Sequence, residues 1–323
     1  MSLGFMTSTE LLASIKLRCA SPISQVTFTD EDLLSFAQEE TELKLLPSIL
    51  AVREEFYVTV ATIPVVAGQN NYEIPYRAIG NKVRSIFYEQ SPGNLISLAN
   101  IPMELLNNYS TNSFPYQFAG FVLENDHLKL VPNIGTTVNG NLILRYYLRP
   151  NNIVKMSRGA RIRSIDRTTG VIEVSNGSTG ANTVPSNITI TGQIDFIKGK
   201  STNKTYSFDI DPASVNASGG TITFATTDIP SELVVGDWIC NAGETVIPQV
   251  PPELHVMLAQ AVACRVLESL GDTQGLQNAN QKLAEMETKL LSVIDNRIES
   301  PFRKVLNTNT QLTKGRISRR RYY

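Results

Sequence analysis

The chain has 323 residues, of which 42 % are hydrophobic, and its 29 basic and 30 acidic side chains give a formal net charge of −1. Set against about 100 to 200 residues per domain, this length suggests two domains and a sizeable core. A net charge near zero excludes a protein whose whole body binds polyanions, because such domains carry an excess of lysine and arginine.

The three cysteines are Cys19, Cys240 and Cys264, which are too scattered for a disulfide framework or a paired-cysteine metal site. This usage favours a reducing compartment. No apolar run approaches the roughly 18 residues of a membrane span, and the N-terminus lacks the pattern of a signal peptide. We therefore expect a soluble chain that has no secretion signal and contacts no membrane.

Helical patterns occupy residues 1–55. Thr7 and Glu10 have the spacing of a capping box, and a sharper helix start follows at Thr29, with Asp32 at the third helical position. Both starts predict helices that run into amphipathic sequence.

The second of these helices contains Pro47, which lacks an N–H donor and crowds the carbonyl group four residues earlier. We expect a kink or break there, followed by a short continuation. The same helix carries a group of carboxylates: Asp30, Glu31, Glu39, Glu40 and Glu42.

Two-residue alternation replaces the helical period over residues 56–156, which predicts a β region. A strand is expected at residues 56–62, and Asn125 with Asp126 predicts the turn of a hairpin because both tolerate positive φ. In the strand at residues 142–148, one face is predicted to be core: Leu142, Leu144, Tyr146 and Leu148.

Residues 157–241 are rich in Thr, Ser, Asn and Gly and are broken into short strand-like pieces. This pattern is typical of a small sandwich or barrel, and we interpret it as a separate β module inserted into the chain. Strands are expected near residues 161–165, 171–174, 188–190, 194–197, 206–210, 221–224 and 234–240.

Helix returns over residues 242–298, where Pro251 and Pro252 favour a helix start and Gly271 favours a helix end. Apolar side chains then recur in two seven-residue series, which predicts a helical hairpin packed within a bundle of the N- and C-terminal helices. The seam consists of Leu276, Ala279, Leu283, Met286, Leu290 and Val293.

Residues 299–323 form an extended tail in which no acidic residue follows Glu299. It is interpretable as a nucleic-acid arm, a docking arm for a protein partner or a solvated tail. The candidate contact residues of this tail are Arg303, Lys304, Lys314, Arg316, Arg319, Arg320, Arg321, Tyr322 and Tyr323.

Little in the sequence points to catalysis. The chain has only two histidines, His127 and His255, which are too few for most histidine-based triads or metal sites. Gly199 and the Lys-Ser pair after it lack the upstream glycine of a phosphate loop. Asp209, Asp211 and Asp166 lack the spacing of a calcium loop. We expect no enzyme activity, no cofactor and no metal.

Several local phrases occur in a fixed order, namely FTDEDLL at 28–34, REEFYV at 53–58, IPYRAIG at 74–80, FVLE at 121–124, YYLRP at 146–150, VGDWI at 235–239 and PPELH at 251–255. This order of phrases and elements, an α+β chain with helical ends around β material, resembles the head-to-tail connector (adaptor) proteins of tailed bacteriophages. The likeness covers most of the chain.

The resemblance implies a structural virion protein of the neck, made in the cytoplasm of the host bacterium. Such a protein forms a ring, commonly of twelve copies, beneath the portal protein and continues the channel through which genomic DNA passes without sequence recognition. Its other partner is the tail or a second neck protein, and the C-terminal tail is expected to contact the portal. The inserted β module faces outward or grips the next tail component. In such a ring the carboxylates Asp30, Glu31, Glu39, Glu40 and Glu42 are expected to contact a neighbouring subunit or to line the channel, where they would repel the phosphates of DNA.

Two rival functions come from other classes. The basic tail is compatible with a nucleic-acid-binding assembly protein, which would bind DNA with steep salt dependence. The Thr/Ser/Asn-rich module is compatible with a glycan-binding or hydrolytic tail component, but Trp238 is the only tryptophan available as an aromatic platform.

Overall fold

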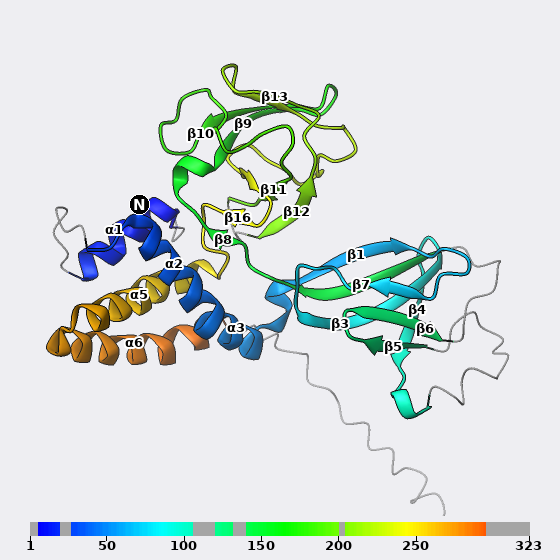
Figure 1. Cartoon of the computed structure of the whole chain (residues 1–323), viewed down its shortest axis with the longest axis horizontal. Coiled ribbons are helices and arrows are strands. Elements are labelled where there is room, and N and C mark those ends of the chain that lie inside the picture. The colour runs from blue at the N-terminus through cyan, green and yellow to red at the C-terminus, as the bar shows by residue number, and fades with distance from the viewer. Residues whose placement is uncertain (1–5, 20–26, 106–119, 132–139, 200–203, 295–323) are drawn as a thin grey trace, which may run out of the picture.

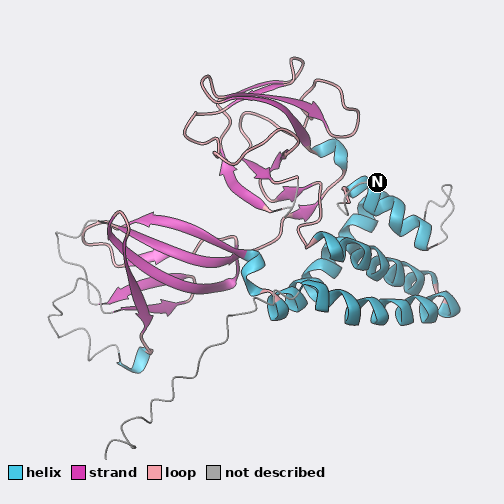
Figure 2. Ribbon diagram, turned by 180° about the vertical axis from the view of Figure 1, so that it is seen from behind, coloured by secondary structure: helices cyan, strands magenta, loops and turns pink. Residues whose placement is uncertain are grey.

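The computed structural model describes residues 6–19, 27–105, 120–131, 140–199 and 204–294. It shows an α+β protein with a helical part and two curled sheets, so the α+β part of the predicted fold class is confirmed. In Figure 1 the helices, the first sheet and the second sheet form three lobes around a short central strand pair, and Figure 2 shows the same separation from behind. No helix in the described ranges is long and apolar enough to cross a membrane.

Helices from both ends of the chain pack around one hydrophobic cluster. Helix α5 lies at its centre, in contact with α1, α2 and α6, and its Leu258 and Val262 are fully buried. The helices are α1 (Ser8–Arg18), α2 (Asp30–Glu40), α3 (Leu46–Val52), α5 (His255–Leu270) and α6 (Thr273–Ile294).

Both predicted helix starts are present, and each has a capping box. The backbone N–H of Thr7 donates to Oε2 of Glu10 at 2.8 Å, and that of Thr29 donates to Oδ2 of Asp32 at 2.8 Å. Hydrogen bonds from Thr29 lower the pKa of Asp32. These local bonds satisfy helix N–H groups that have no partner inside the helix.

The kink expected at Pro47 takes the form of a wider helical turn. Helix α2 passes without a break into a π-helical turn, Thr41–Leu45, and then into α3, with Pro47 in the first turn of α3. Because proline cannot donate to the carbonyl four residues back, the wider turn accommodates its ring while the helix continues. A 3-10 turn, Glu54–Tyr57, then leads into the first strand.

The C-terminal helices meet at Gly271, whose φ of +73° ends α5 as predicted. Along α6 the predicted seam faces the cluster at every position but its last. Val293 is 63 % exposed and Ile294 is 3 % exposed, so the prediction for Val293 is wrong. A straight helix has 3.6 residues per turn and drifts away from an exact seven-residue repeat, which brings Ile294 to the buried face.

The first sheet has seven strands in the order β1-β7-β3-β4-β5-β6-β2 and curls around Leu128, Leu142 and Leu144, which are fully buried. All neighbours are antiparallel except β4 and β5. Its strands are β1 (Val58–Pro64), β2 (Asn71–Glu73), β3 (Ala78–Ser91), β4 (Asn94–Asn100), β5 (Gly120–Glu124), β6 (His127–Val131) and β7 (Asn141–Leu148).

The predicted hairpin and the core face of β7 are confirmed. Asn125 has a φ of +58° in the turn between β5 and β6, and Tyr146 of β7 is fully buried. The long strand β3 was not predicted. Gly80 and Asn81 adopt positive φ, and the register with β7 shifts between Ala78 and Val83, so the two-residue alternation is interrupted.

The second sheet also has seven strands, in the order β12-β11-β15-β9-β10-β14-β13. It is one curled sheet, a half-barrel whose outer strands β12 and β13 do not pair with each other, rather than the expected sandwich or closed barrel. Its strands are β9 (Ala160–Asp166), β10 (Val171–Asn176), β11 (Ile194–Ile197), β12 (Thr205–Ile210), β13 (Ser214–Asn216), β14 (Thr221–Thr223) and β15 (Trp238–Asn241).

The strand expected at residues 188–190 is wrong. Ile188 is buried in the core of the half-barrel, but its N–H donates to the carbonyl of Pro185 at 3.0 Å in a turn. Apolar burial alone therefore produced the strand-like pattern.

A short parallel pair joins the sheets to the helices. Strand β8 (Asn152–Ile153) precedes the second sheet and β16 (Glu244–Thr245) follows it, so the chain enters and leaves that sheet side by side. The pair brackets the predicted module, whose boundaries at residues 157 and 241 stay predictions.

The buried His255 predicts a loss of stability in mild acid. Its Nδ1 accepts from the N–H of Met6 at 3.0 Å, and burial lowers its pKa to about 4, although carbonyl groups of Val250 and Pro248 partly oppose the shift. The unfolded chain binds this proton near pH 6.5, so stability is complete above that pH and falls as the pH drops toward about 4, by about 3 kcal/mol.

Urea unfolding at a series of pH values measures this effect. In His255→Gln the free energy of unfolding should fall less between about pH 6.5 and 4 than in the unmodified protein. The difference should be about 3 kcal/mol. Equal pH profiles for the two proteins would show that His255 does not contribute.

Candidate functional site

Arg77 lies in the turn that leads into β3, at the junction of the two sheets. The N–H of Ala78 donates to the carbonyl of Pro75 at 2.8 Å, and the N–H of Arg149 donates to the carbonyl of Arg77 at 2.8 Å. These bonds fix the backbone of Arg77, and its side chain, 7 % exposed, reaches across to the second sheet.

The guanidinium of Arg77 forms ion pairs with two aspartates of the second sheet. Nη1 lies 2.7 Å from Oδ2 of Asp195, and Nη2 lies 3.1 Å from Oδ1 of Asp195 and 2.5 Å from Oδ1 of Asp209. The rings of Tyr76 and Phe208 flank the guanidinium carbon at 5.6 and 5.3 Å. Burial lowers the pKa of Arg77, but hydrogen bonds with Asp195 and Tyr76 and the two carboxylate charges outweigh it, so the pKa is raised.

Asp195 is fully buried in β11 and every side of its carboxylate is occupied. Besides Arg77, it accepts from Nδ2 of Asn151 at 2.6 Å, from the N–H of Gly243 at 2.9 Å and from the N–H of Asp209 at 3.1 Å. Asp209 has a φ of +58°. A buried ion pair contributes only when such additional bonds compensate the loss of water.

This network, which we call the Arg77 joint, connects the turn before β3 with β11, β12 and the residues that directly precede β8 and β16, Asn151 and Gly243. Asp209 was weighed from the sequence as a cation ligand, and its carboxylate is instead bound to Arg77 and to the hydroxyl of Tyr76 at 2.8 Å. Arg77 and Asp195 were not singled out from the sequence. The available signal was an aspartate between Ile194 and Phe196 in an apolar strand.

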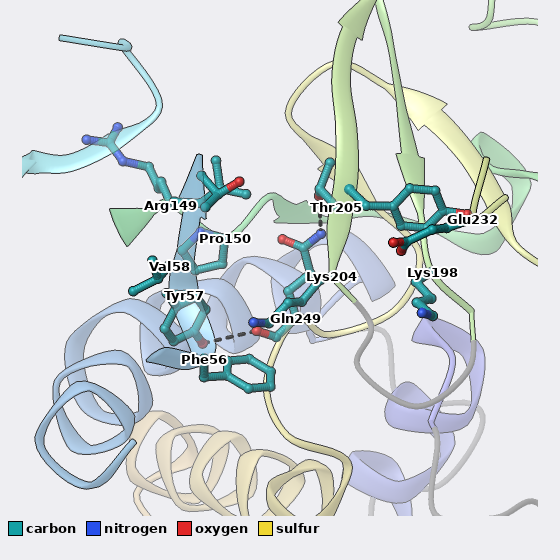
Figure 3. A pocket seen from close by; sticks show the side chains of 13 residues that line it. Phe56, Tyr57, Val58, Arg149, Pro150, Lys198, Lys204, Thr205, Glu232 and Gln249 are labelled. Atoms are coloured by element: carbon teal, nitrogen blue, oxygen red, sulfur yellow. Dashed lines mark hydrogen bonds between the residues drawn. The ribbon is translucent and has the colours of Figure 1, made fainter. Parts of the chain in front are cut away.

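A pocket of about 260 Å³ lies beside the joint, between the start of β1 and the start of β12 (Figure 3). One wall comes from the first sheet and the turn before it, the other from the second sheet. Its lining consists of Phe56, Tyr57, Val58, Thr59, Leu148, Arg149, Pro150, Lys198, Lys204, Thr205, Tyr206, Glu232 and Gln249.

The inner wall of the pocket is a chain of hydrogen bonds. The hydroxyl of Tyr57 donates to the carbonyl of Gln249 at 3.0 Å, and Nε2 of Gln249 donates to Oγ1 of Thr205 at 2.6 Å. Figure 3 shows these three residues in line across the pocket. Burial raises the pKa of Tyr57, so its hydroxyl stays protonated.

Lys204 supplies a half-buried cation to the same pocket. Its Nζ lies 4.6 Å from the centre of the Phe56 ring. Burial and the nearby charge of Arg53 lower its pKa to about 8, although Glu55 opposes the shift. Among the charged neighbours named, the repulsion by Arg53 thus outweighs the attraction by Glu55.

The carboxylates of α2, predicted to line a channel or contact a neighbour, have partners within the chain. Nζ of Lys16 lies 2.6 Å from Asp30 and Nζ of Lys155 lies 2.9 Å from Glu31. The guanidinium of Arg265 pairs with both Glu39 and Glu40, the latter at 3.4 Å.

Nε2 of Gln38 donates to Glu42 at 2.7 Å. Glu40 is only 5 % exposed, so it serves the packing of α2 against α5. The role of the other carboxylates in a channel stays a prediction.

The predicted portal-contact residues, all between Arg303 and Tyr323, lie outside the described residues. The remaining motifs have structural roles where they are described. The N–H of Gly199 donates to Asp237 at 2.9 Å, and Asp166 accepts from the N–H of Thr168 at 2.9 Å in its own turn. In the described part of the chain, no group of three His, Cys, Asp or Glu side chains is placed to hold a metal ion.

Residues 6–157 match the family model described as SU10 adaptor protein. The resemblance to phage head-to-tail adaptors is thereby confirmed for this part of the chain, which contains helices α1 to α3, the first sheet and Arg77. A search of curated proteins found no match to the chain.

Replacing Arg77 should destabilise the protein strongly. In Arg77→Met the side chain keeps much of its volume but leaves the Asp195 carboxylate buried without a cation, which should lower the free energy of unfolding by about 3 to 5 kcal/mol in urea denaturation. Asp195→Asn in the same chain should restore part of this loss.

The matched control is Arg145→Met on β7, an exposed arginine that stacks on Phe87 at 5.0 Å. This substitution should lower the free energy of unfolding by less than about 1 kcal/mol. Equal costs for the two methionine variants would contradict a special role for the Arg77 joint.

Proposed function

We propose, on the premise that residues 6–157 belong to the SU10 adaptor protein family, that this chain is a structural component of a phage virion that joins the portal to the tail. In this proposal its copies form a ring beneath the portal, twelve being the number that the resemblance implies, and the ring continues the channel for genomic DNA. The family match carries the proposal. Adaptors of this kind are generally not enzymes, and we propose no catalytic role.

The shape of the subunit supports a role in assembly. Three lobes provide separate surfaces for a neighbouring copy, the portal and a tail or second neck protein (Figure 1). A ring requires two different, mutually complementary side faces on each subunit, and it closes when the rotation between copies closes. The buried Arg77 joint keeps two of these lobes in a fixed relation, which a closed ring needs.

The C-terminal tail is proposed to contact the portal. It follows α6, which ends at Ile294, and it combines arginines with a terminal tyrosine pair. Arginine and tyrosine are enriched among the residues that dominate the binding energy of protein interfaces.

The exposed carboxylates of α2 and of the turn after it are proposed to face DNA or a neighbouring subunit. Side chains of Glu31 and Glu39 are 76 and 45 % exposed, and Glu42 is also exposed. Carboxylates on a channel wall repel phosphates, which would let DNA pass without binding.

One observation weakens the glycan-binding alternative. Trp238 is 5 % exposed and packs in a small buried cluster with Ile197, Cys240 and Val246, separate from the core of the second sheet. Its ring is therefore not a platform on which a sugar could stack.

Mass photometry of the full chain, alone and mixed with its portal, tests the proposal. We expect copies of the chain to bind the portal in a fixed number that matches the number of portal subunits. A chain ending at Glu299 should lose at least about tenfold in affinity, because its docking arginines and tyrosines are absent. The full-length triple variant Arg319→Ser, Arg320→Ser and Arg321→Ser should also bind the portal with lower affinity.

A chain that stays monomeric beside the portal in every form would contradict the adaptor ring. DNA affinity that falls steeply with salt and disappears with the tail would instead support the nucleic-acid-binding alternative.

A further inference from the structure

Strand β1 forms an outer edge of the first sheet. Among the strands that the structure describes it pairs only with β7, over Val58 to Pro64. The register runs through all of these residues without a shift, and the strand contains no charged residue. Its other edge therefore presents a regular row of backbone donors and acceptors as far as Ile63, while Pro64 at its end has no N–H to donate.

The other outer strands of the two large sheets lack this combination. Strands β2 and β13 have three residues each. Strand β12 pairs with β11 through shifted register, and its Asp209 adopts a positive φ and is bound in the Arg77 joint. Edge strands of soluble proteins are usually short, irregular or charged, because an open regular edge pairs with other chains. β1 is the edge suited to receive an additional strand.

The pocket described above adjoins the open edge. Val58 and Thr59 at the start of β1 and Thr205 and Tyr206 of β12 are all part of its lining (Figure 3). A segment paired with β1 would therefore have one end at this pocket.

The charge in the pocket is predominantly positive. Lys198, Lys204 and Arg149 line it against the single carboxylate of Glu232. Among the ion pairs formed by the described residues, none includes Lys204. Its ammonium group is repelled by the charge of Arg53 and attracted by that of Glu55, and Arg53 is itself paired with Glu55. The pocket thus favours an anionic group.

We propose that this site binds an extended acidic segment of a partner protein, which adds as a strand to the open edge of β1 and places a carboxylate beside Lys204 and Lys198. Backbone hydrogen bonds to β1 provide affinity that is largely independent of sequence, and the carboxylate fixes the direction of the segment. The inference goes beyond the adaptor ring and does not require it, because it concerns only this edge and this pocket.

The probe is an end-blocked, fluorescent peptide with two glutamates followed by alternating threonine and valine, titrated into the full chain by anisotropy. Because pairing through the backbone tolerates sequence, this peptide is a sufficient probe. A peptide with lysines in place of the glutamates should bind about tenfold more weakly. Lys204→Met should lower the affinity for the acidic peptide by a similar factor, and the control Lys129→Met on β6 should not.

Backbone pairing is tested with two N-methylated forms of the acidic peptide, methylated at odd or at even positions. An added strand directs only alternate N–H groups toward β1, so one form should lose binding and the other should keep it. Equal binding of both forms, equal binding of the lysine peptide, or no binding of the acidic peptide would overturn the proposal.

A second copy of this chain is the other candidate occupant of the edge. If Val60→Lys, a change at a residue that is 52 % exposed, converted an oligomer of the free protein into monomers, the edge would belong to an interface between copies and the proposal would be wrong. Val60→Lys is expected to leave the mass of the free protein unchanged.

Discussion

The buried ion pair between Arg77 and Asp195 is the interaction on which the arrangement of the two sheets depends. Removing both charges from water is costly, so the pair is tolerated only because each remaining donor and acceptor is satisfied, including amide groups of Asn151 and Gly243. Moving one sheet relative to the other would break several of these bonds together. The width of the pocket and the spacing of β1 and β12 follow from this constraint.

The helical part is held together by a different principle. Helix α5 is largely buried up to Leu267, and apolar contacts with α1, α2 and α6 provide its stability. The ion pair of Lys16 with Asp30 at the start of α2 is partly exposed and contributes little by comparison. The protein thus combines an apolar core that tolerates small adjustments with a polar joint whose geometry is strictly defined.

Features encoded by neighbouring residues were predictable from the sequence. The capping boxes at Thr7 and Thr29, the helix end at Gly271 and the turn at Asn125 each depend on a few adjacent positions. The Arg77 joint was not predictable, because its aspartates are 118 and 132 residues away in the chain. Strand β3 was missed because the positive φ of Gly80 and Asn81 interrupts its alternation. The prediction of a sandwich or barrel did not identify the half-barrel, because strand patterns do not reveal how far a sheet closes.

The parallel pair of β8 and β16 has an evolutionary consequence. Because the chain leaves for the second sheet and returns from it at adjacent strands, a short connection could bridge the two points at little entropic cost. The family match ends at residue 157, close to this departure point. The second sheet is therefore positioned as an insertion, which evolution can gain, lose or exchange while the helices and the first sheet keep their fold.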